Sequence, residues 1–195
     1  RVGKGEDVEC IDRTGRRHRA RIVELTRERV VLEVEAGGIA PGWTLPRITL
    51  YPALLPEKMF DVILQKGTEV GVAACIPVIT ARTVAKYKEG KVSRWQKIAD
   101  EAARQCGGAP MRVEEPLALD EIREAAGGRR IVADNRGARM GAGDTLNADE
   151  FSLLTGPEGG FTEEEIARFV AAGWTPVAFH PNILRAETAA VVCSA

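Results

Sequence analysis

The chain has 195 residues, of which 45% are hydrophobic and 28% charged, and this suits one large or two small soluble globular domains. No apolar stretch is long enough to span a bilayer, which argues against an integral membrane protein. The four cysteines form no C-x-x-C pair, which argues against zinc-ribbon and thioredoxin-like proteins and favours free thiols in a cytoplasmic protein. The two histidines have no ligand at metal-binding spacing, so we expect no metal site.

The net charge of −1 conceals an uneven distribution of charge along the chain. Residues 1–50 carry 10 basic and 8 acidic side chains, residues 51–112 carry 10 and 6, and residues 113–195 carry 7 and 14. The basic clusters in the first two segments either bind phosphates or form a solvated face. These clusters are Arg13, Arg16, Arg17, Arg19 and Arg21, then Arg82, Lys86, Lys88, Lys91, Arg94 and Lys97.

The first 50 residues have the pattern of short strands. Branched residues alternate or cluster over 6–12, 17–25 and 29–35, and glycine turn signals separate these runs. This predicts a small β-barrel or sandwich, followed by a strand or linker over 48–54. Because the chain begins at Arg1 without a methionine, we expect the start of this domain to be incomplete.

From Pro56 onward, helical and strand patterns alternate, which predicts an α/β domain with a mostly parallel sheet. Helices are expected over 56–70, from Ser93, and over 119–126, 162–172 and 186–194. Strands are expected over 72–80, 111–114, 130–133, 151–154 and 175–179. Two helix starts resemble capping boxes, Ser93-x-x-Gln96 and Thr162-x-x-Glu165.

The most informative segment is residues 153–161, LLTGPEGGF. A strand, a glycine loop and a helix start follow one another there, and this geometry lets backbone N–H groups approach a ligand closely. By itself the motif fits a tight turn equally well. Ligands of parallel sheets bind at the carboxyl ends of the strands, where loops 134–136, 155–161 and 180–185 are expected. The last two loops flank the same helix and strand, so we expect them to converge on one ligand.

Segments 153–161 and 182–189 (NILRAETA) together resemble the RsmE family of ribosomal RNA uridine-N3 methyltransferases, in the SPOUT superfamily. Further matching segments are 65–72 (QKGTEVGV), Pro77 with Arg82, 94–95 (RW) and 101–107 (EAARQCG). The resemblance covers about the last 140 residues. It implies a SPOUT domain over 53–195 with a C-terminal trefoil knot. Residues 1–52 would be a partial PUA-like RNA-binding β-barrel.

The resemblance also implies a cofactor and partners. The cofactor would be S-adenosylmethionine, and the substrate one uridine of 16S ribosomal RNA in the small subunit, methylated at N3. The protein would be a cytoplasmic homodimer without membrane association. The expected cofactor-binding residues are Leu154, Thr155, Gly156, Glu158, Gly159, Gly160, Phe179, Ile183, Leu184 and Thr188.

Arg185 and Glu187 are the candidate catalytic residues. Methylation of uridine N3 requires loss of its proton, and Arg185 would stabilise the developing negative charge. Glu187 either takes part in catalysis or stabilises the start of the last helix electrostatically. Lys66 has a similar alternative, since it either pairs with Glu69 or faces RNA. The candidate RNA-binding residues are Arg16, Arg17, Arg19, Lys66, Arg82, Arg94 and Arg104.

Two positions depart from the family pattern. His180 stands where a glycine is usual, so a positive φ in this tight loop, which glycine would allow, is in question. Gly108 stands where an arginine is usual, so one RNA contact is missing. Two alternatives therefore stay open: a SPOUT methyltransferase acting on another RNA or position, and a non-catalytic RNA-binding relative.

Overall fold

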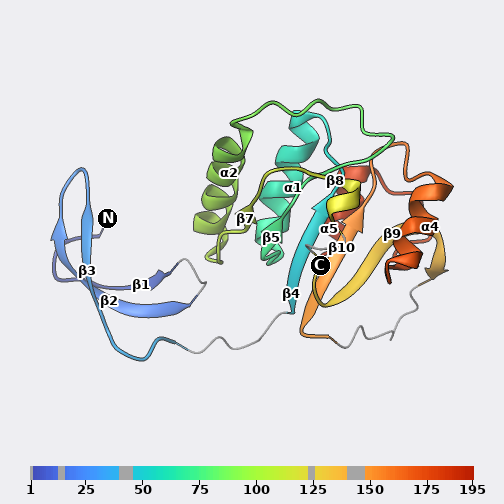
Figure 1. Cartoon of the computed structure of the whole chain (residues 1–195). Coiled ribbons are helices and arrows are strands. Elements are labelled where there is room, and N and C mark those ends of the chain that lie inside the picture. The colour runs from blue at the N-terminus through green and yellow to red at the C-terminus, as the bar shows by residue number, and fades with distance from the viewer. Residues whose placement is uncertain (1, 13–15, 40–45, 123–125, 140–147) are drawn as a thin grey trace.

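The computed structural model describes residues 2–12, 16–39, 46–122, 126–139 and 148–195. Near its start, three strands form an antiparallel sheet in the order β1-β2-β3, in agreement with the three predicted strands (Figure 1). They are β1 (Asp7–Ile11), β2 (Arg17–Leu25) and β3 (Val30–Val34). The central strand β2 buries Ala20 and Ile22, so the small sheet has one apolar face.

The second part contains a six-stranded sheet in the order β11-β9-β10-β4-β5-β7, and every neighbouring pair is parallel. This confirms the α/β prediction. The central strands are hydrophobic because both of their faces are covered. The strands are β4 (Arg47–Pro52), β5 (Ala74–Cys75), β7 (Arg112–Val113), β9 (Arg129–Arg139), β10 (Glu150–Thr155) and β11 (Thr175–Ala178).

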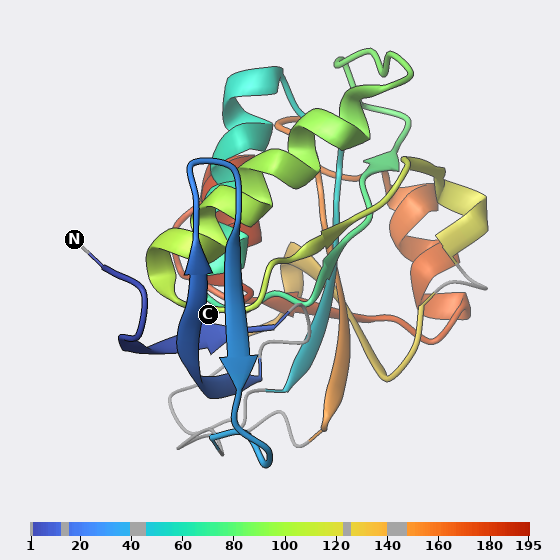
Figure 2. The same ribbon diagram turned by 90° about the vertical axis from the view of Figure 1, so that its left-hand side faces the viewer.

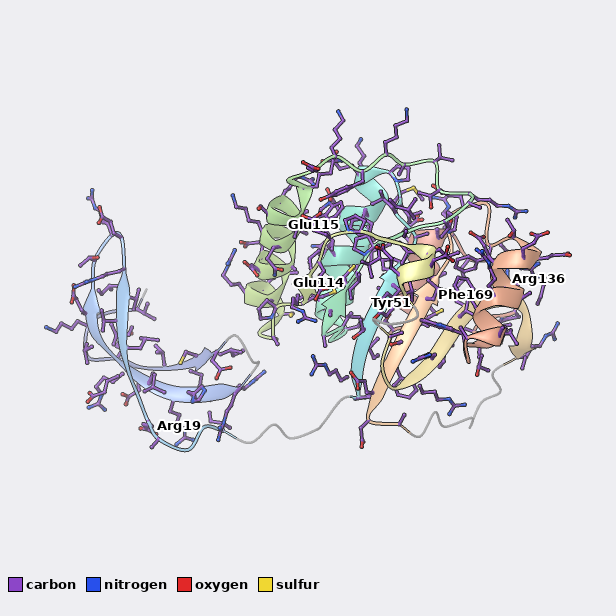
Figure 3. The ribbon with its side chains drawn as sticks, viewed as in Figure 1. Arg19, Tyr51, Glu114, Glu115, Arg136 and Phe169 are labelled. Atoms are coloured by element: carbon purple, nitrogen blue, oxygen red, sulfur yellow. The ribbon has the colours of Figure 1, made fainter. Side chains whose placement is uncertain are left out.

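Helices cover both faces of this sheet (Figure 2). On one face, α1 (Glu57–Glu69), α2 (Lys91–Cys106) and α5 (Ala186–Val192) contribute Phe60, Trp95 and Ala190 to one buried cluster. On the other face, α4 (Glu163–Ala171) and the 3₁₀ helix η1 (Leu119–Glu121) pack near a second cluster. That cluster joins Phe169 of α4 to Tyr51 of the sheet (Figure 3).

The predicted strand over 72–80 is divided into two short strands that belong to different sheets. β5 is part of the large sheet, whereas β6 (Val78–Ile79) pairs with β8 (Leu117–Ala118). Pro77 lies between them and has no N–H to donate to a strand ladder, which explains the break. The helix predicted over 119–126 begins as η1, and its residues 123–125 lie outside the described part of the chain.

The capping box predicted at Ser93 is wrong. α2 begins at Lys91, and its N-cap is Gly90, which has a φ of 84° and offers no side chain. The Gln96 side chain instead reaches β7, where it donates to the Met111 carbonyl at 3.0 Å and accepts from the Val113 N–H at 2.9 Å. Gln96 therefore fixes α2 to the sheet edge, a long-range contact that local spacing cannot show.

The capping box predicted at Thr162 is confirmed. The Thr162 hydroxyl accepts from the Glu165 N–H at 3.1 Å, and the Glu165 carboxylate accepts from the Thr162 N–H at 2.8 Å. The second carboxylate oxygen accepts from the Ala81 N–H at 2.8 Å. Glu165 is buried and thus connects the start of α4 to the segment after β6.

We predict that Glu165→Ala destabilises the protein. The substitution leaves the N–H groups of Ala81 and Thr162 without their charged acceptor, at a cost of about 2 kcal/mol. Glu163, in the same first turn but exposed, provides the matched control, and Glu163→Ala should cost about 0.5 kcal/mol. Chemical denaturation measures both free energies of unfolding. Equal losses in the two variants would contradict the bridging role of Glu165.

Candidate functional site

A cavity of about 620 Å³ lies where β10 and β11 end, beside residues 133–136 of β9, and we call it the loop cavity. The predicted loops 155–161 and 180–185 converge on it, as expected for the carboxyl ends of parallel strands. The loop predicted over 134–136 is wrong, because these residues lie within β9, which continues to Arg139; they reach the cavity where the register between β9 and β11 shifts. The predicted cofactor residues Gly156, Glu158, Gly159, Gly160, Phe179, Ile183 and Leu184 line the loop cavity, together with Arg185. The other lining residues are Met59, Arg82, Ala133, Asp134, Asn135, Arg136, Pro157, Phe161, Val177, His180, Ala186, Ala189 and Cys193.

The glycine loop after β10 is tightly folded. Gly160 has a φ of 65°, and its N–H donates to the Pro157 carbonyl at 2.8 Å. A Cβ at Gly156 would lie 3.1 Å from the Phe161 ring. These two glycines therefore allow a backbone course that other residues would strain or block.

Arg82 holds the glycine loop from the opposite side. Its guanidinium donates to the carbonyl oxygens of Gly159 at 2.6 Å and Phe161 at 3.4 Å. Because Glu165 anchors the adjacent Ala81, the Arg82 backbone is fixed as well. Arg82 was a candidate for RNA binding, and the structure places it in the wall of the loop cavity.

The segment before α5 forms the other wall of the cavity. Ile183 is 87% exposed, and Arg185 is the N-cap residue of α5 with an exposed side chain. His180 takes the place of the usual glycine without strain, because no non-glycine residue in the described ranges has a positive φ. Its Nδ1 accepts from the Asn182 N–H at 3.1 Å, so the histidine stabilises the turn.

The middle of β9 contributes an ion pair to the cavity. The Arg136 guanidinium donates to both carboxylate oxygens of Asp134, at 2.9 and 2.7 Å. The backbone N–H of Arg136 also donates to the Asp134 carboxylate, at 2.8 Å. These contacts hold the pKa of the Asp134 carboxyl below its ordinary value. The arginine lies beside α4 (Figure 3) and also approaches the Phe161 carbonyl at 3.4 Å.

The Asp134–Arg136 pair predicts a pH dependence of stability. A carboxyl whose pKa is lowered by folding stabilises the native state above its unfolded pKa of about 4. This contribution is lost as the pH falls through the lower pKa of the folded protein. The stability difference between wild type and Arg136→Gln should thus be constant above about pH 5 and shrink below about pH 4. Denaturant titrations across this range measure it, and a difference that does not change with pH would contradict it.

Among the candidate cofactor-binding and catalytic residues, four lie outside the lining of the loop cavity. Leu154 and Thr155 are buried in β10, with Leu154 packed in the second core cluster. Thr188 is exposed on α5. Glu187 is half-buried, and its Oε2 is buried without a hydrogen-bond partner among the described residues.

Several candidate RNA-binding residues are engaged in contacts within the protein. Lys66 pairs with Glu69 at 2.8 Å, which is one of the two alternatives predicted for it. Arg94 pairs with Asp61 at 2.6 Å, and Arg104 pairs with Glu101. In the small sheet, Arg16 donates to the Gly37 carbonyl at 2.8 Å, and Arg17 to the Gly107 carbonyl at 3.5 Å. Arg19 lies on the same small sheet, exposed and far from Arg136 (Figure 3).

Sequence reasoning did not assign part of the cavity wall. Met59 comes from the first turn of α1, and Ala189 and Cys193 come from α5 and its end. Burial raises the pKa of Cys193 to about 12, so its thiol stays neutral. These residues have the ordinary apolar spacing of helices, so no local signal separates them from other core residues.

The described ranges contain neither a metal-site arrangement nor a membrane-spanning helix. No cluster of three or more histidine, cysteine, aspartate or glutamate side chains there has the arrangement of a metal site. None of the helices described is long and apolar enough to cross a membrane.

Comparison with known proteins identifies the family. Residues 43–195 match the family model of the RNA methyltransferase domain, which is well over half of the chain. The chain belongs to this RNA methyltransferase family. Ribosomal RNA small subunit methyltransferase E of Synechocystis is 33% identical over all of the chain and 66% of its own length. The Bacillus subtilis enzyme of the same name is 30% identical, over 97% of the chain and 80% of its own length.

Solved structures of this methyltransferase family agree with the fold. Ribosomal RNA small subunit methyltransferase E from Neisseria gonorrhoeae, bound to S-adenosyl methionine, is 28% identical with a TM-score of 0.84. The alignment covers 99% of the chain and 82% of that structure. The chain spans about two thirds of the Synechocystis and Aquifex aeolicus relatives, at 66% and 65% of their lengths. The expected resemblance to the RsmE family is thus confirmed.

Proposed function

We propose that the chain transfers a methyl group from S-adenosylmethionine to N3 of one uridine in 16S ribosomal RNA of the small subunit. The observation that carries this proposal is the loop cavity, in which the glycine loop faces the segment ending at Arg185. The relatives named for small-subunit ribosomal RNA methylation support the substrate, and the neighbour bound to S-adenosyl methionine supports the cofactor. The uridine N3 position follows from the family resemblance.

The residues of the loop cavity fit this cofactor. A Cβ at Gly156 would lie 3.1 Å from Phe161, and a Cβ at Gly159 would lie 3.3 Å from Arg82. Glycine at both positions therefore keeps the loop backbone accessible. Backbone groups of the loop suit the adenine edge, and Ile183 and Leu184 supply apolar walls. We also assign Leu154 and Thr155 to cofactor binding through their backbone, with Glu158, Gly160, Phe179 and Thr188.

The bound cofactor supplies an electrophilic methyl group on a positively charged sulfur. Transfer would form a bond between N3 and the methyl carbon as the bond from sulfur to that carbon breaks, with its electron pair staying on sulfur, and the N3 proton would pass to a base or to water. The protein must align the uracil and stabilise the negative charge that develops on it. Arg185 is suited to this role because its exposed side chain makes no ion pair within the described ranges. Glu187 is the second candidate catalytic residue.

RNA would approach over basic residues of both parts of the chain. We propose a PUA-like RNA-binding domain over 1–52, which presents Arg16, Arg17 and Arg19, and a SPOUT domain with a trefoil knot over 53–195. In the second domain, Lys66, Arg82, Arg94 and Arg104 are the candidate phosphate contacts, although their present partners would have to be exchanged. We further propose a cytoplasmic homodimer.

The proposed function is tested with labelled S-adenosylmethionine and small subunits that lack the modification. We expect label in one uridine, at N3, when the nucleosides are mapped. Label in another RNA or at another position would support a related methyltransferase of different specificity. Calorimetry that detects no S-adenosylmethionine binding would favour a non-catalytic RNA-binding protein.

A further inference from the structure

A second cavity, of about 330 Å³, lies between the starts of α1 and α2, and we call it the α1–α2 cavity. None of the functions assigned above uses it. Its walls include Leu55 and Phe60 of the first core cluster, and the segment 84–87 closes it on one side. The residues that matter for its chemistry are Phe60, Lys86, Tyr87, Lys91 and Trp95.

The aromatic walls of the α1–α2 cavity are held in place. Trp95 packs against Phe60 with ring centroids 4.7 Å apart and against Tyr87 at 5.9 Å. The Tyr87 hydroxyl donates to Glu115, labelled in Figure 3, and this bond raises the pKa of Tyr87 to about 12. Tyr87 is only half-buried, so part of this fixed and neutral aromatic surface is open to solvent.

Trp95 contributes a hydrogen-bond donor that is not used within the protein. The residue is 2% exposed, and its indole Nε1 has no hydrogen-bond partner among the described residues. A buried donor without an acceptor costs free energy, and such groups often mark a binding site. A ligand with a carbonyl or similar acceptor would remove this cost.

Two lysines add positive charge at the α1–α2 cavity. Lys86 is exposed, whereas Lys91 lies 3.7 Å from Glu57 in an ion pair. A flat ring that carries acceptors, joined to a phosphate, matches the combination of aromatic walls, unused donor and lysines. This combination is the chemistry of a nucleotide.

The α1–α2 cavity is also close to the loop cavity along the chain. Arg82 lines the loop cavity and Val84 lines the α1–α2 cavity. Residues two positions apart are separated by at most about 7 Å. The first turn of α1 is likewise shared, since Met59 lines one cavity and Phe60 the other. One RNA strand can therefore reach both cavities.

We propose that the α1–α2 cavity binds one nucleotide of the RNA substrate near the target uridine, an inference that rests on the proposed action on RNA. The base packs against the open face of Tyr87, and its entry displaces the side chains that cover Trp95, so that the indole N–H donates to a base carbonyl. The phosphate lies at Lys86. This site holds the strand while the target base occupies the loop cavity.

Nuclear magnetic resonance tests the site directly, because the chain has three tryptophans and thus three indole N–H signals. Trp95→Phe identifies the signal of Trp95. Saturating S-adenosylmethionine is present throughout, and uridine 5′-monophosphate or a short oligouridylate is added. We expect the Trp95 signal to shift. An unshifted Trp95 signal overturns the proposal, and so does an equal shift with an oligoglutamate, since charge alone would then explain it.

Matched lysine variants test the phosphate contact. Lys86 lines the cavity, whereas Lys88 is also exposed but does not line it. Lys86→Ala should raise the Kd for oligouridylate about threefold, as for one exposed charge contact, with Lys88→Ala unchanged. Equal effects of the two variants would overturn the assignment.

Methylation assays separate this site from the proposed function. Trp95→Phe keeps an aromatic ring but removes the donor, so the KM for small subunits should rise about fivefold while the Kd for S-adenosylmethionine stays constant. Loss of cofactor affinity as well would indicate a structural role for Trp95 and overturn the proposal. If wild type does not methylate small subunits but the Trp95 signal shifts with oligouridylate, only the proposed function fails.

Discussion

Arg185→Ala should lower kcat for RNA methylation by about 10²–10³-fold, because one preorganised positive charge at a reacting group has an effect of this size. The Kd for S-adenosylmethionine should stay nearly constant, since the proposed contacts of the cofactor are with backbone and apolar groups. The Arg185 side chain is exposed and makes no ion pair with described residues, so the substitution should leave folding stability nearly unchanged.

The control for Arg185 is Arg129, which is also an exposed arginine. Arg129 begins β9, at the end of the sheet opposite to the loop cavity. Single-turnover methylation of small subunits measures the chemical step, and calorimetry measures cofactor binding in the same variants. A normal rate in Arg185→Ala, or an equal loss in Arg129→Ala, would refute the assigned role of Arg185.

Gly160→Ala should weaken S-adenosylmethionine binding by at least about tenfold, the effect of 1.4 kcal/mol of lost binding free energy. Gly160 has a φ of 65°, where an alanine is strained by about 1–2 kcal/mol. The loop relieves this strain by moving, and movement redirects its backbone groups. Space is not the cause, because a Cβ at Gly160 would have no neighbour within 4 Å.

Gly173 is a closely matched control for Gly160. Its φ is 84°, a Cβ there would also have no neighbour within 4 Å, and it follows α4 outside the loop cavity. Both alanine variants should lose similar stability, but only Gly160→Ala should lose cofactor affinity. Thermal unfolding and calorimetry compare the two. Equal cofactor binding in both variants would show that the loop backbone does not hold the cofactor.

Local patterns in the sequence were sufficient to predict much of the fold. The alternation of helices and strands predicted the parallel sheet, because strands buried on both faces are continuously apolar. The prediction of a capping box at Thr162 and Glu165 was correct because its hydrogen bonds join residues close in sequence. The glycine loop was recognised for the same reason, since Gly156 and Gly160 meet a local backbone requirement.

Long-range contacts account for the expectations that local spacing misjudged. Ser93 and Gln96 have the spacing of a capping box, but Gln96 forms its hydrogen bonds with Met111 and Val113 across the fold. The apolar run through Pro77 was expected to form one strand, yet its two halves found partners in different sheets. In both cases a distant partner competes with the local pattern, and the sequence alone does not reveal that partner.

The site shows the same division. Sequence motifs were enough to predict that the glycine loop and the 182–189 segment belong together, because both motifs are contiguous and their order is specific to a family. The contacts of each cation became visible only in the folded chain: Arg82 holds the glycine loop, whereas Lys66 and Arg94 are paired with carboxylates. The physical reason is that a charged side chain acts through the neighbours brought to it by folding, and these lie far away along the chain.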